Sequence, residues 1–343
     1  MFTRIVKYFL IWRIGLFVIL FFAVKFVPLQ SNFLGGGMQN YLANPYFWAW
    51  GNFDGEHYLA IAQFRYQPLT YFFFPLYPLL IGFFGGTQFA ALFISHLSFL
   101  IALFGLYKLV RLDFSEKVSK WTIILILAFP TSFFFGSVYT ESLFLMLVIW
   151  FFYFLRKKKW FGVVVLGTLA SATRFVGSLL LIPFGLFTYM YYLLKTTGDP
   201  LAFIHNITLF GGQRSENFVF LPQVFYRYIF KVIPNLNYSY FPSVFTTFLE
   251  LLVAILFLFL IIFSFKKLKP VYTYFLTAGY LVSTLSGSFS SLPRYVSVLF
   301  PAFILMAVFL EKRPLVIKAV SVGLLMVLSI ISVMLFTRGY FIA

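Results

Sequence analysis

The sequence predicts an all-α fold, a polytopic bundle of transmembrane helices. Hydrophobic residues make up 62% of the 343 residues and charged residues only 10%, whereas a soluble domain is about 45–50% apolar and about 25% charged. The apolar runs are continuous, as in VILFFAVKFV, and lack the alternation of a transmembrane β-barrel. These observations exclude a soluble enzyme and a disordered chain, and the absence of cysteine excludes a disulfide scaffold.

The charge balance of the chain is strongly basic. Its 26 Lys and Arg residues exceed 9 Asp and Glu residues, for a formal net charge of +17. In a soluble protein this excess indicates nucleic-acid binding. In a membrane protein Lys and Arg instead collect in cytoplasmic loops. We therefore interpret the charge as a topology signal, and expect membrane lipids and no nucleic acid as partners.

Ten or eleven apolar segments follow one another in a single integral membrane domain over residues 1–343. They cover about residues 8–27, 72–84 with 88–109, 121–134, 142–155, 160–173, 176–194, 244–265, 271–285, 296–310 and 315–336. The first lacks a cleavage site and is expected to be an uncleaved span. The prolines at positions 75 and 78 predict that residues 72–84 form a broken entry to the next span.

Basic clusters predict the orientation of the bundle. Arg4, Lys7 and Arg13 indicate a cytoplasmic N-terminus, so that about residues 28–71 form the first exoplasmic loop. The middle of the chain stays open. Both ends of residues 160–265 are basic, which requires an even number of crossings, yet three candidates are present. Either one of the first two is a half-helix, or a fourth crossing lies near residues 218–233.

On this topology several ionisable residues from separate places in the chain fall on or near the outer face. They are Asp54, Glu56, His57, Glu141, Arg174 and Arg294. Ionisable groups at membrane depth are costly and usually mark a functional site. Loop Lys and Arg clusters alone determined the topology, so this shared location is an independent indication of a site facing away from the cytoplasm.

The first exoplasmic loop contains a predicted short interfacial helix from Asp54 to about Arg65. Asp54, His57 or Tyr58, Ile61 and Arg65 have the spacing of one helix face. Glu56 is rotated by about 200° from Asp54, which argues against a paired-carboxylate site. Asp54 is therefore either a catalytic group or an acidic residue that favours the helix dipole, and the surrounding aromatic residues are compatible with an interfacial belt.

Several motifs resemble those of one enzyme family. GNFDGEHYLAIAQFRYQ followed by FFFPLYP is similar to the first exoplasmic loop of the PIG-V family, the GPI mannosyltransferase II-like enzymes. SVYTESLF, ATRFVGSLL, TGDPLAFIHN and LPRYVSVLFP also resemble family segments in the same order, so the likeness runs from about residue 46 to 301. The chain departs from the family pattern at Asn52-Phe53, at Arg65 and at Val138.

The resemblance implies a GT-C integral membrane glycosyltransferase. Such enzymes take a sugar, in this family mannose, from a polyprenyl-phosphate donor and transfer it to a lipid or glycan acceptor, with an acidic residue of the first exoplasmic loop as catalytic base. Asp54 stands at that position. Tyr66, Tyr77 and Tyr295 lie within the matched motifs, and the resemblance implies that they bind substrate.

The residues themselves suit this chemistry. One carboxylate can deprotonate an acceptor hydroxyl as it attacks the sugar, and Arg offers a forked donor for the departing phosphate. Arg174 and Arg294 are the candidates for that role, unless they only snorkel to lipid headgroups. Glu141 is expected to bind sugar hydroxyls or to pair with one of these arginines, and His57 to hold Asp54 or phosphate unless its role is structural.

Other assignments are less specific. Asp199, Glu216 and Glu250 receive no role. No cofactor is expected, and the sequence offers neither an HExxH motif nor a carboxylate pair to support a divalent metal. The main alternative is a transporter or flippase for a lipid-linked substrate, although such proteins often show inverted repeats and none is recognisable here. A non-catalytic lipid-binding or assembly subunit is the third possibility.

Overall fold

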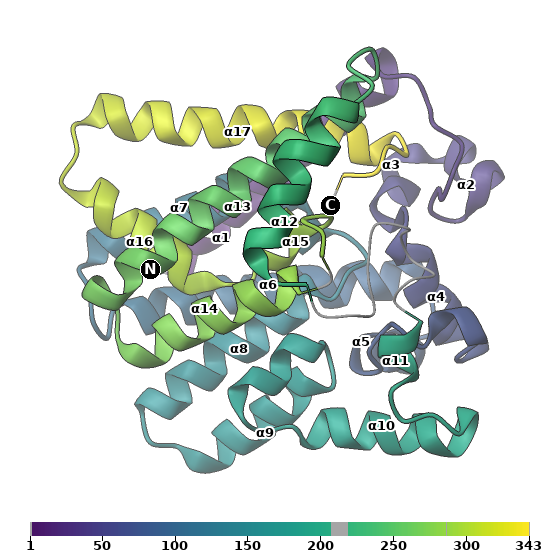
Figure 1. Cartoon of the computed structure of the whole chain (residues 1–343), viewed down its shortest axis with the longest axis horizontal. Coiled ribbons are helices and arrows are strands. Elements are labelled where there is room, and N and C mark those ends of the chain that lie inside the picture. Colours follow the sequence, from purple (N-terminus) through teal and green to yellow (C-terminus); the bar gives the residue numbers. More distant parts are fainter. Residues whose placement is uncertain (1, 207–218, 286, 343) are drawn as a thin grey trace.

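The computed structural model describes residues 2–206, 219–285 and 287–342, and its regular structure in these ranges is helical. The α-helices are α1 (Phe2–Phe26), α2 (Gly37–Ala43), α3 (Pro45–Trp48), α4 (Asp54–Phe64), α5 (Leu76–Phe83), α6 (Gln88–Val110), α7 (Glu116–Ala128), α8 (Glu141–Arg156), α9 (Trp160–Ser171), α10 (Phe184–Thr197), α11 (Ala202–His205), α12 (Leu221–Arg227), α13 (Phe241–Lys267), α14 (Pro270–Thr284), α15 (Leu292–Val296), α16 (Phe300–Glu311) and α17 (Leu315–Thr337). Short 3₁₀ or π turns join several of them (Figure 1).

Within the described residues, four helices are long and apolar enough to cross a membrane. They are α1, α6, α13 and α17, which contain 23 to 27 residues each. A bilayer crossing needs about 20 apolar residues in helical form, so these helices meet the requirement by length and composition. The sequence prediction of an all-helical, membrane-type bundle is confirmed at this level.

Several predicted segments prove shorter or broken. Helix α7 ends at Ala128, before Pro130, and residues 132–136 form a separate 3₁₀ turn. Residues 176–194 are divided between a 3₁₀ turn and α10, with Leu181 at φ 61° and Pro183 between them. In the last but one segment, residues 296–310, α15 ends at Val296 and α16 begins only at Phe300. The predicted continuous helices were wrong in these places because prolines interrupt them.

The open middle of the chain also resolves into short pieces. Helix α9 has 12 residues, and α12 runs on into a π turn at Tyr228–Val232 and a 3₁₀ turn at Ile233–Asn235. Residue 218 and Glu216 lie outside the described residues. Helix α5, with eight residues, is separate from α6, as the predicted broken entry requires.

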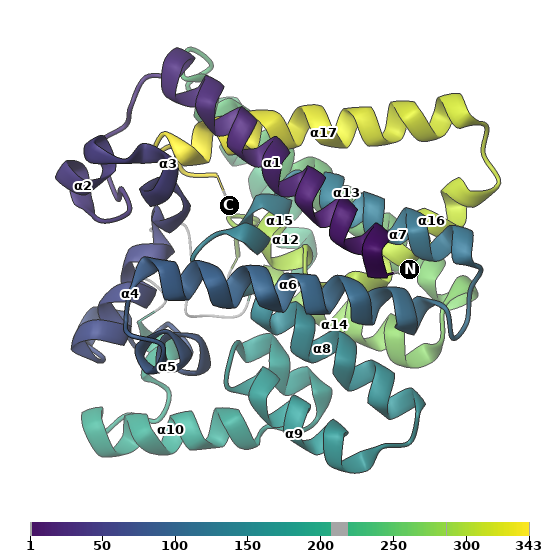
Figure 2. The ribbon, with the colours of Figure 1, turned by 180° about the vertical axis from the view of Figure 1, so that it is seen from behind.

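The basic loops gather at one end of the bundle. The N-terminus and the α6–α7, α8–α9, α13–α14 and α16–α17 connections lie at the left in Figure 1 and at the right in the reverse view of Figure 2. Contacts agree with the pictures. Asp113 of the α6–α7 loop pairs with Arg156 and with Lys269, and Ser115 donates to Glu311. Helices α2, α4 and α5 lie at the opposite end.

The core is dominated by aromatic residues at the centre of the bundle. Phe99 of α6 stacks on Phe135 of the 3₁₀ turn after α7, with ring centroids 4.5 Å apart. Trp12 of α1 packs against Phe99 and donates to Ser132 Oγ at 3.2 Å. These contacts fix the segment between α7 and α8, which leads directly to Glu141.

Candidate functional site

Asp54 is the first residue of α4, and the segment before it is fixed from several sides. Asn52 accepts a hydrogen bond from Gly35 N at 2.8 Å and donates one to Phe336 O, at the end of α17, at 2.9 Å. Phe53 has φ 58°, a conformation that costs energy for a bulky residue. Strain of this kind occurs where surrounding contacts hold the chain, and here those contacts direct Asp54 toward a cavity.

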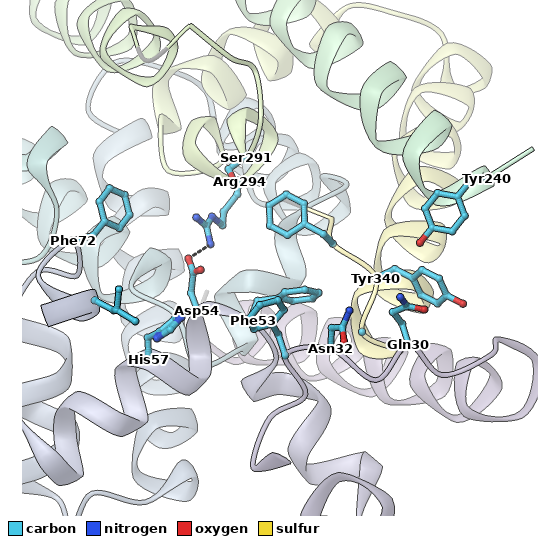
Figure 3. A pocket seen from close by; sticks show the side chains of 14 residues that line it. Gln30, Asn32, Phe53, Asp54, His57, Phe72, Tyr240, Ser291, Arg294 and Tyr340 are labelled. Atoms are coloured by element: carbon cyan, nitrogen blue, oxygen red, sulfur yellow. Dashed lines mark hydrogen bonds and ion pairs between the residues drawn. The ribbon is translucent and has the colours of Figure 1, made fainter. Parts of the chain in front are cut away.

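The cavity has a volume of about 610 Å³. Its wall is formed by Gln30, Asn32, Phe33, Phe53, Asp54, His57, Leu69, Phe72, Tyr240, Ser291, Arg294, Gly339, Tyr340 and Phe341. Figure 3 shows Asp54, His57 and Arg294 together on one side, Phe53 in the middle, and Gln30, Asn32, Tyr240 and Tyr340 on the other side. The cavity therefore has a charged end and an end lined by amides and tyrosine side chains.

Four of the predicted charged residues form one continuous network. Arg294 Nη1 donates to Asp54 Oδ2 at 2.5 Å, and Arg294 Nε lies 3.6 Å from Glu141 Oε1. Arg174 Nη1 donates to the same Glu141 oxygen at 2.8 Å. We call Asp54, Arg294, Glu141 and Arg174 the pocket cluster. It unites four distant parts of the chain, as the shared outer location in the sequence analysis indicated.

The interior of the pocket cluster is buried. The Glu141 side chain is 2% exposed and that of Arg294 7%, whereas that of Asp54 is 24% exposed. Glu141 Oε2 and Arg294 Nε are buried and meet no hydrogen-bond partner among the described residues. Buried polar atoms without partners are rare and call for an explanation. Of the two residues, Arg294 itself lines the cavity.

Aromatic rings surround the Arg294 guanidinium. Its Cζ lies 5.5 Å from the ring centre of Phe134, 5.3 Å from that of Tyr139 and 5.0 Å from that of Tyr295. Arg294 Nη2 also donates to Tyr295 Oη at 3.2 Å. Cation–π contacts of this kind are strongest where water is excluded, so the rings hold the cation in place at the cavity wall.

The two other ionisable residues of α4 have different surroundings. His57 lines the cavity and stacks on Phe73 at 5.0 Å. Burial lowers its pKa, and the charge of Asp54 opposes that shift. Glu56 does not line the cavity. Burial raises the pKa of the Glu56 carboxyl, and a backbone hydrogen bond from Gly37 offsets only part of this rise. The helix geometry thus separates Glu56 from Asp54, as predicted.

The structure does not bring every predicted binding residue to the cavity. Tyr77 is fully buried, and its hydroxyl contacts Ala91 O and Ser95 Oγ. Tyr66 donates to Phe73 O at 2.7 Å and does not line the cavity. Arg174 also lies behind Glu141 and outside the lining. Tyr295 does not line the cavity and accepts a hydrogen bond from Arg294, which does. Tyr66, Tyr77 and Arg174 do not line the cavity, and their contact with substrate stays a prediction.

Part of the cavity wall was missed by sequence reasoning. Tyr240 immediately precedes α13, and Gly339 to Phe341 follow α17. Arg338 Nε donates to Val27 O at 2.9 Å and Gln30 N donates to Arg338 O at 2.9 Å, which brings the chain end onto the first loop. At Gly339, φ is 81° and an added Cβ would lie 2.3 Å from Gln30 O, so glycine is required there.

The unassigned acidic residues of the described chain have local partners. Tyr228 Oη donates to Glu250 Oε2 at 2.7 Å, and His205 Nδ1 lies 2.6 Å from Asp199 Oδ2. Neither Glu250 nor Asp199 lines the cavity. Across residues 2–206, 219–285 and 287–342, no group of three or more His, Asp or Glu side chains is arranged to hold a metal ion.

Comparisons with protein-family models, with curated proteins and with solved structures find no match. The chemistry of this site must therefore be argued from its own residues. The fold provides an all-helical frame, and the site provides a cavity with a carboxylate, a guanidinium and an imidazole at one end.

Proposed function

We propose that the chain is a membrane glycosyltransferase of the GT-C type, similar to the GPI mannosyltransferase II-like enzymes. It would transfer a sugar, mannose by resemblance, from a polyprenyl-phosphate donor to a hydroxyl of a lipid or glycan. The observation that supports this best is the Asp54–Arg294 pair in the wall of the cavity. A group that accepts a proton lies there beside a group that holds phosphate.

The proposed reaction is a single displacement. The acceptor oxygen attacks the anomeric carbon, and Asp54 takes the hydroxyl proton. The bond between that carbon and the phosphate oxygen breaks, and the electron pair leaves with the polyprenyl phosphate, whose charge Arg294 offsets. One base without a second carboxylate nucleophile beside it implies inversion at the anomeric carbon, because Glu56 does not line the cavity.

Glu141 and Arg174 would then act through Arg294. Glu141 does not line the cavity and its Oε1 lies 3.6 Å from Arg294 Nε, and Arg174 balances the charge of Glu141. A buried carboxylate without such a cation would be costly. We therefore assign the phosphate contact to Arg294 and regard Glu141 and Arg174 as positioning residues.

We further propose that the end of the bundle with the basic loops is cytoplasmic and that the cavity faces the exoplasmic side. The positive-inside rule supports this orientation, as does the separation of the basic loops from α4 in Figures 1 and 2. A reporter fused after Arg156 should be cytoplasmic, while tags near Asn40 or Ser288 should be exoplasmic. Asn40 on the same side as Arg156 would contradict the orientation.

The test of the activity uses the purified protein in lipid vesicles. Polyprenyl-phosphate sugars are supplied with a mixture of lipid acceptors, and release of free polyprenyl phosphate is measured, together with the anomeric configuration of the product. We expect release by the wild type and by Glu56→Gln, and an inverted product. Sugar lipid that crosses the vesicle membrane without release would favour a flippase, and a retained configuration would rule out the single displacement.

A further inference from the structure

The shortest contact of the pocket cluster joins the two groups that the proposed reaction needs to keep apart. Asp54 Oδ2 accepts from Arg294 Nη1 at 2.5 Å, so the carboxylate lies on the guanidinium face where a phosphate oxygen would bind. Both residues line the cavity, and Figure 3 shows their contact at its charged end. A phosphate ester that enters the cavity must therefore compete with Asp54 for Arg294.

Arg294 is the fixed partner of this pair. Its side chain is 7% exposed, and the rings of Phe134, Tyr139 and Tyr295 enclose its guanidinium. Ser297 Oγ donates to Arg294 O at 2.6 Å, within the turn at the end of α15. Glu141 Oε1 also attracts the guanidinium, at 3.6 Å from Nε. These contacts remain when Asp54 moves away, so the cation stays where it is.

Asp54 is the partner that is free to move. Its side chain is 24% exposed, more than that of any other member of the pocket cluster. Rotation about its first side-chain bond between staggered positions would move the carboxylate away from Arg294 without a shift of α4. The movement carries the charge toward the more open side, while the incoming anion takes its place on Arg294.

We propose that Asp54 occupies the anion site of Arg294 while the cavity is empty, and that a prenyl phosphate ester displaces it. This proposal rests on the proposed function, because it assigns an order of events to the same site. The donor binds first and releases the carboxylate, which is then available as a base for the acceptor. Arg294 has an anionic partner throughout, so no buried cation is left unpaired.

The test is a binding experiment that requires no turnover. Geranyl phosphate, a short prenyl monophosphate, is titrated onto the full-length protein in detergent, and its dissociation constant is measured calorimetrically. Four proteins form a double-mutant cycle: wild type, Asp54→Asn, Arg294→Gln and the double variant. Geraniol and inorganic phosphate are the companion probes, which separate the contributions of the prenyl chain and of the phosphate.

The cycle has a specific expected result. Asp54→Asn should bind geranyl phosphate about ten- to a hundredfold more tightly than the wild type, because the competing charge-assisted hydrogen bond is lost. In the Arg294→Gln background the same change should bring little gain. If Asp54→Asn improves binding equally in the wild type and in Arg294→Gln, the gain comes from removing a negative charge that repels any anion. The proposal that Asp54 and the phosphate exchange places on Arg294 is then wrong. Unchanged binding in Asp54→Asn would also overturn it.

Two controls keep the result clear. Asp113→Asn removes an ion-paired carboxylate at the other end of the bundle, where Arg156 and Lys269 contact it, and should leave geranyl phosphate binding unchanged. If Arg294→Gln fails to fold, Arg294→Lys replaces it in the cycle, because it keeps the charge opposite Glu141 and loses the forked donor. The gain in affinity from Asp54→Asn should then be smaller in the Arg294→Lys background than in the wild type.

The proposal and the proposed function fail in different ways. Tight binding by the wild type without a gain in Asp54→Asn refutes the exchange and leaves a prenyl phosphate site intact. No binding of geranyl phosphate by any of the four proteins refutes both, since no prenyl phosphate site is then present. Equal affinity for geraniol and geranyl phosphate in the wild type also refutes both.

Discussion

Two groups of ion pairs lie at opposite ends of the bundle and are built in different ways. The pocket cluster joins Asp54, Arg294, Glu141 and Arg174 beside the cavity. The second group, which we call the loop cluster, consists of Asp113, Arg156 and Lys269. Both connect segments that are distant in the chain, and both place a carboxylate between two cations.

The loop cluster is fully satisfied. Both oxygens of Asp113 accept hydrogen bonds from Arg156, and Lys269 lies 2.9 Å from Oδ1. Burial would raise the pKa of Asp113, but the hydrogen bonds from Arg156 and Lys269 outweigh it and lower that pKa. None of the three residues lines the 610 Å³ cavity. This arrangement is expected of ion pairs that connect neighbouring loops and stabilise their packing.

The pocket cluster is incompletely satisfied and open to a cavity. Glu141 Oε2 and Arg294 Nε are buried without hydrogen-bond partners among the described residues, and Asp54 is partly exposed. An ion-pair network between helices is therefore not by itself a sign of function. The candidate site differs because it contains buried polar atoms without hydrogen-bond partners, close to a cavity that a ligand can enter.

The largest expected difference between the clusters concerns turnover. Asp54→Asn removes the base and should lower the rate of sugar transfer by about 10²–10⁴, measured as release of polyprenyl phosphate. Asp113→Asn should transfer sugar at the wild-type rate per folded molecule, because it lies far from the cavity. Comparable losses in both variants would show that the two clusters do not differ in function.

The second-largest expected effect comes from replacing the forked guanidinium of an arginine by lysine. Arg294→Lys should lower kcat/KM for the donor by about ten- to a hundredfold, since a point charge does not replace a fork on phosphate. Arg156→Lys also loses a forked contact, the one with Asp113, but donor kinetics should stay at the wild-type value. Normal kinetics in Arg294→Lys would return that residue to a structural role.

For the free energy of unfolding, the loop cluster should matter more than the pocket cluster. Asp113→Asn is expected to lower the free energy of unfolding by about 1–3 kcal/mol, and Asp54→Asn by less, because Asp113 loses contacts with two cations, Arg156 and Lys269, whereas Asp54 loses a contact with one, Arg294. Thermal unfolding in detergent measures both. A carboxylate whose pKa is lowered by folding stabilises above about pH 4, and this contribution disappears as the pH falls through the lowered pKa. Asp113→Asn should remove that dependence.

The smallest effect concerns His57. Burial lowers its pKa below the ordinary value of 6.5, so the imidazole is neutral at pH 7 and becomes charged as the pH falls through the lowered pKa. The new cation beside Arg294 should tighten binding of a singly charged prenyl phosphodiester about two- to fivefold. His57→Gln should lose this tightening when the probe is titrated at successively lower pH, and the same pH response in this variant would exclude His57.

Local sequence patterns gave a good account of the elements that depend on neighbouring residues. The helix predicted from Asp54 to about Arg65 is found at Asp54–Phe64, and Glu56 faces away from Asp54. The long apolar runs with basic ends became α1, α6, α13 and α17. Hydrophobicity and helix periodicity act over a few turns, so they can be read directly from the order of residues.

The broken helices show a limit of that approach. Pro130 and Pro183 were visible in the sequence, yet apolar continuity favoured spans at 121–134 and 176–194. In the structure α7 ends before Pro130 and α10 begins after Pro183. A proline interrupts a helix whatever the hydrophobicity of its neighbours, because it lacks an N–H donor and clashes with the preceding turn.

The sequence by itself determined the class of fold, the helix that carries Asp54 and the kinds of charged residue that meet around it. Only the tertiary structure decided that Arg294 contacts Asp54 while Arg174 is held behind Glu141, that Tyr77 is buried, and that Tyr340 and Phe341 close the cavity. These outcomes depend on which distant segments pack together. Contacts between residues hundreds of positions apart are determined by packing of the whole bundle, and no local pattern encodes them.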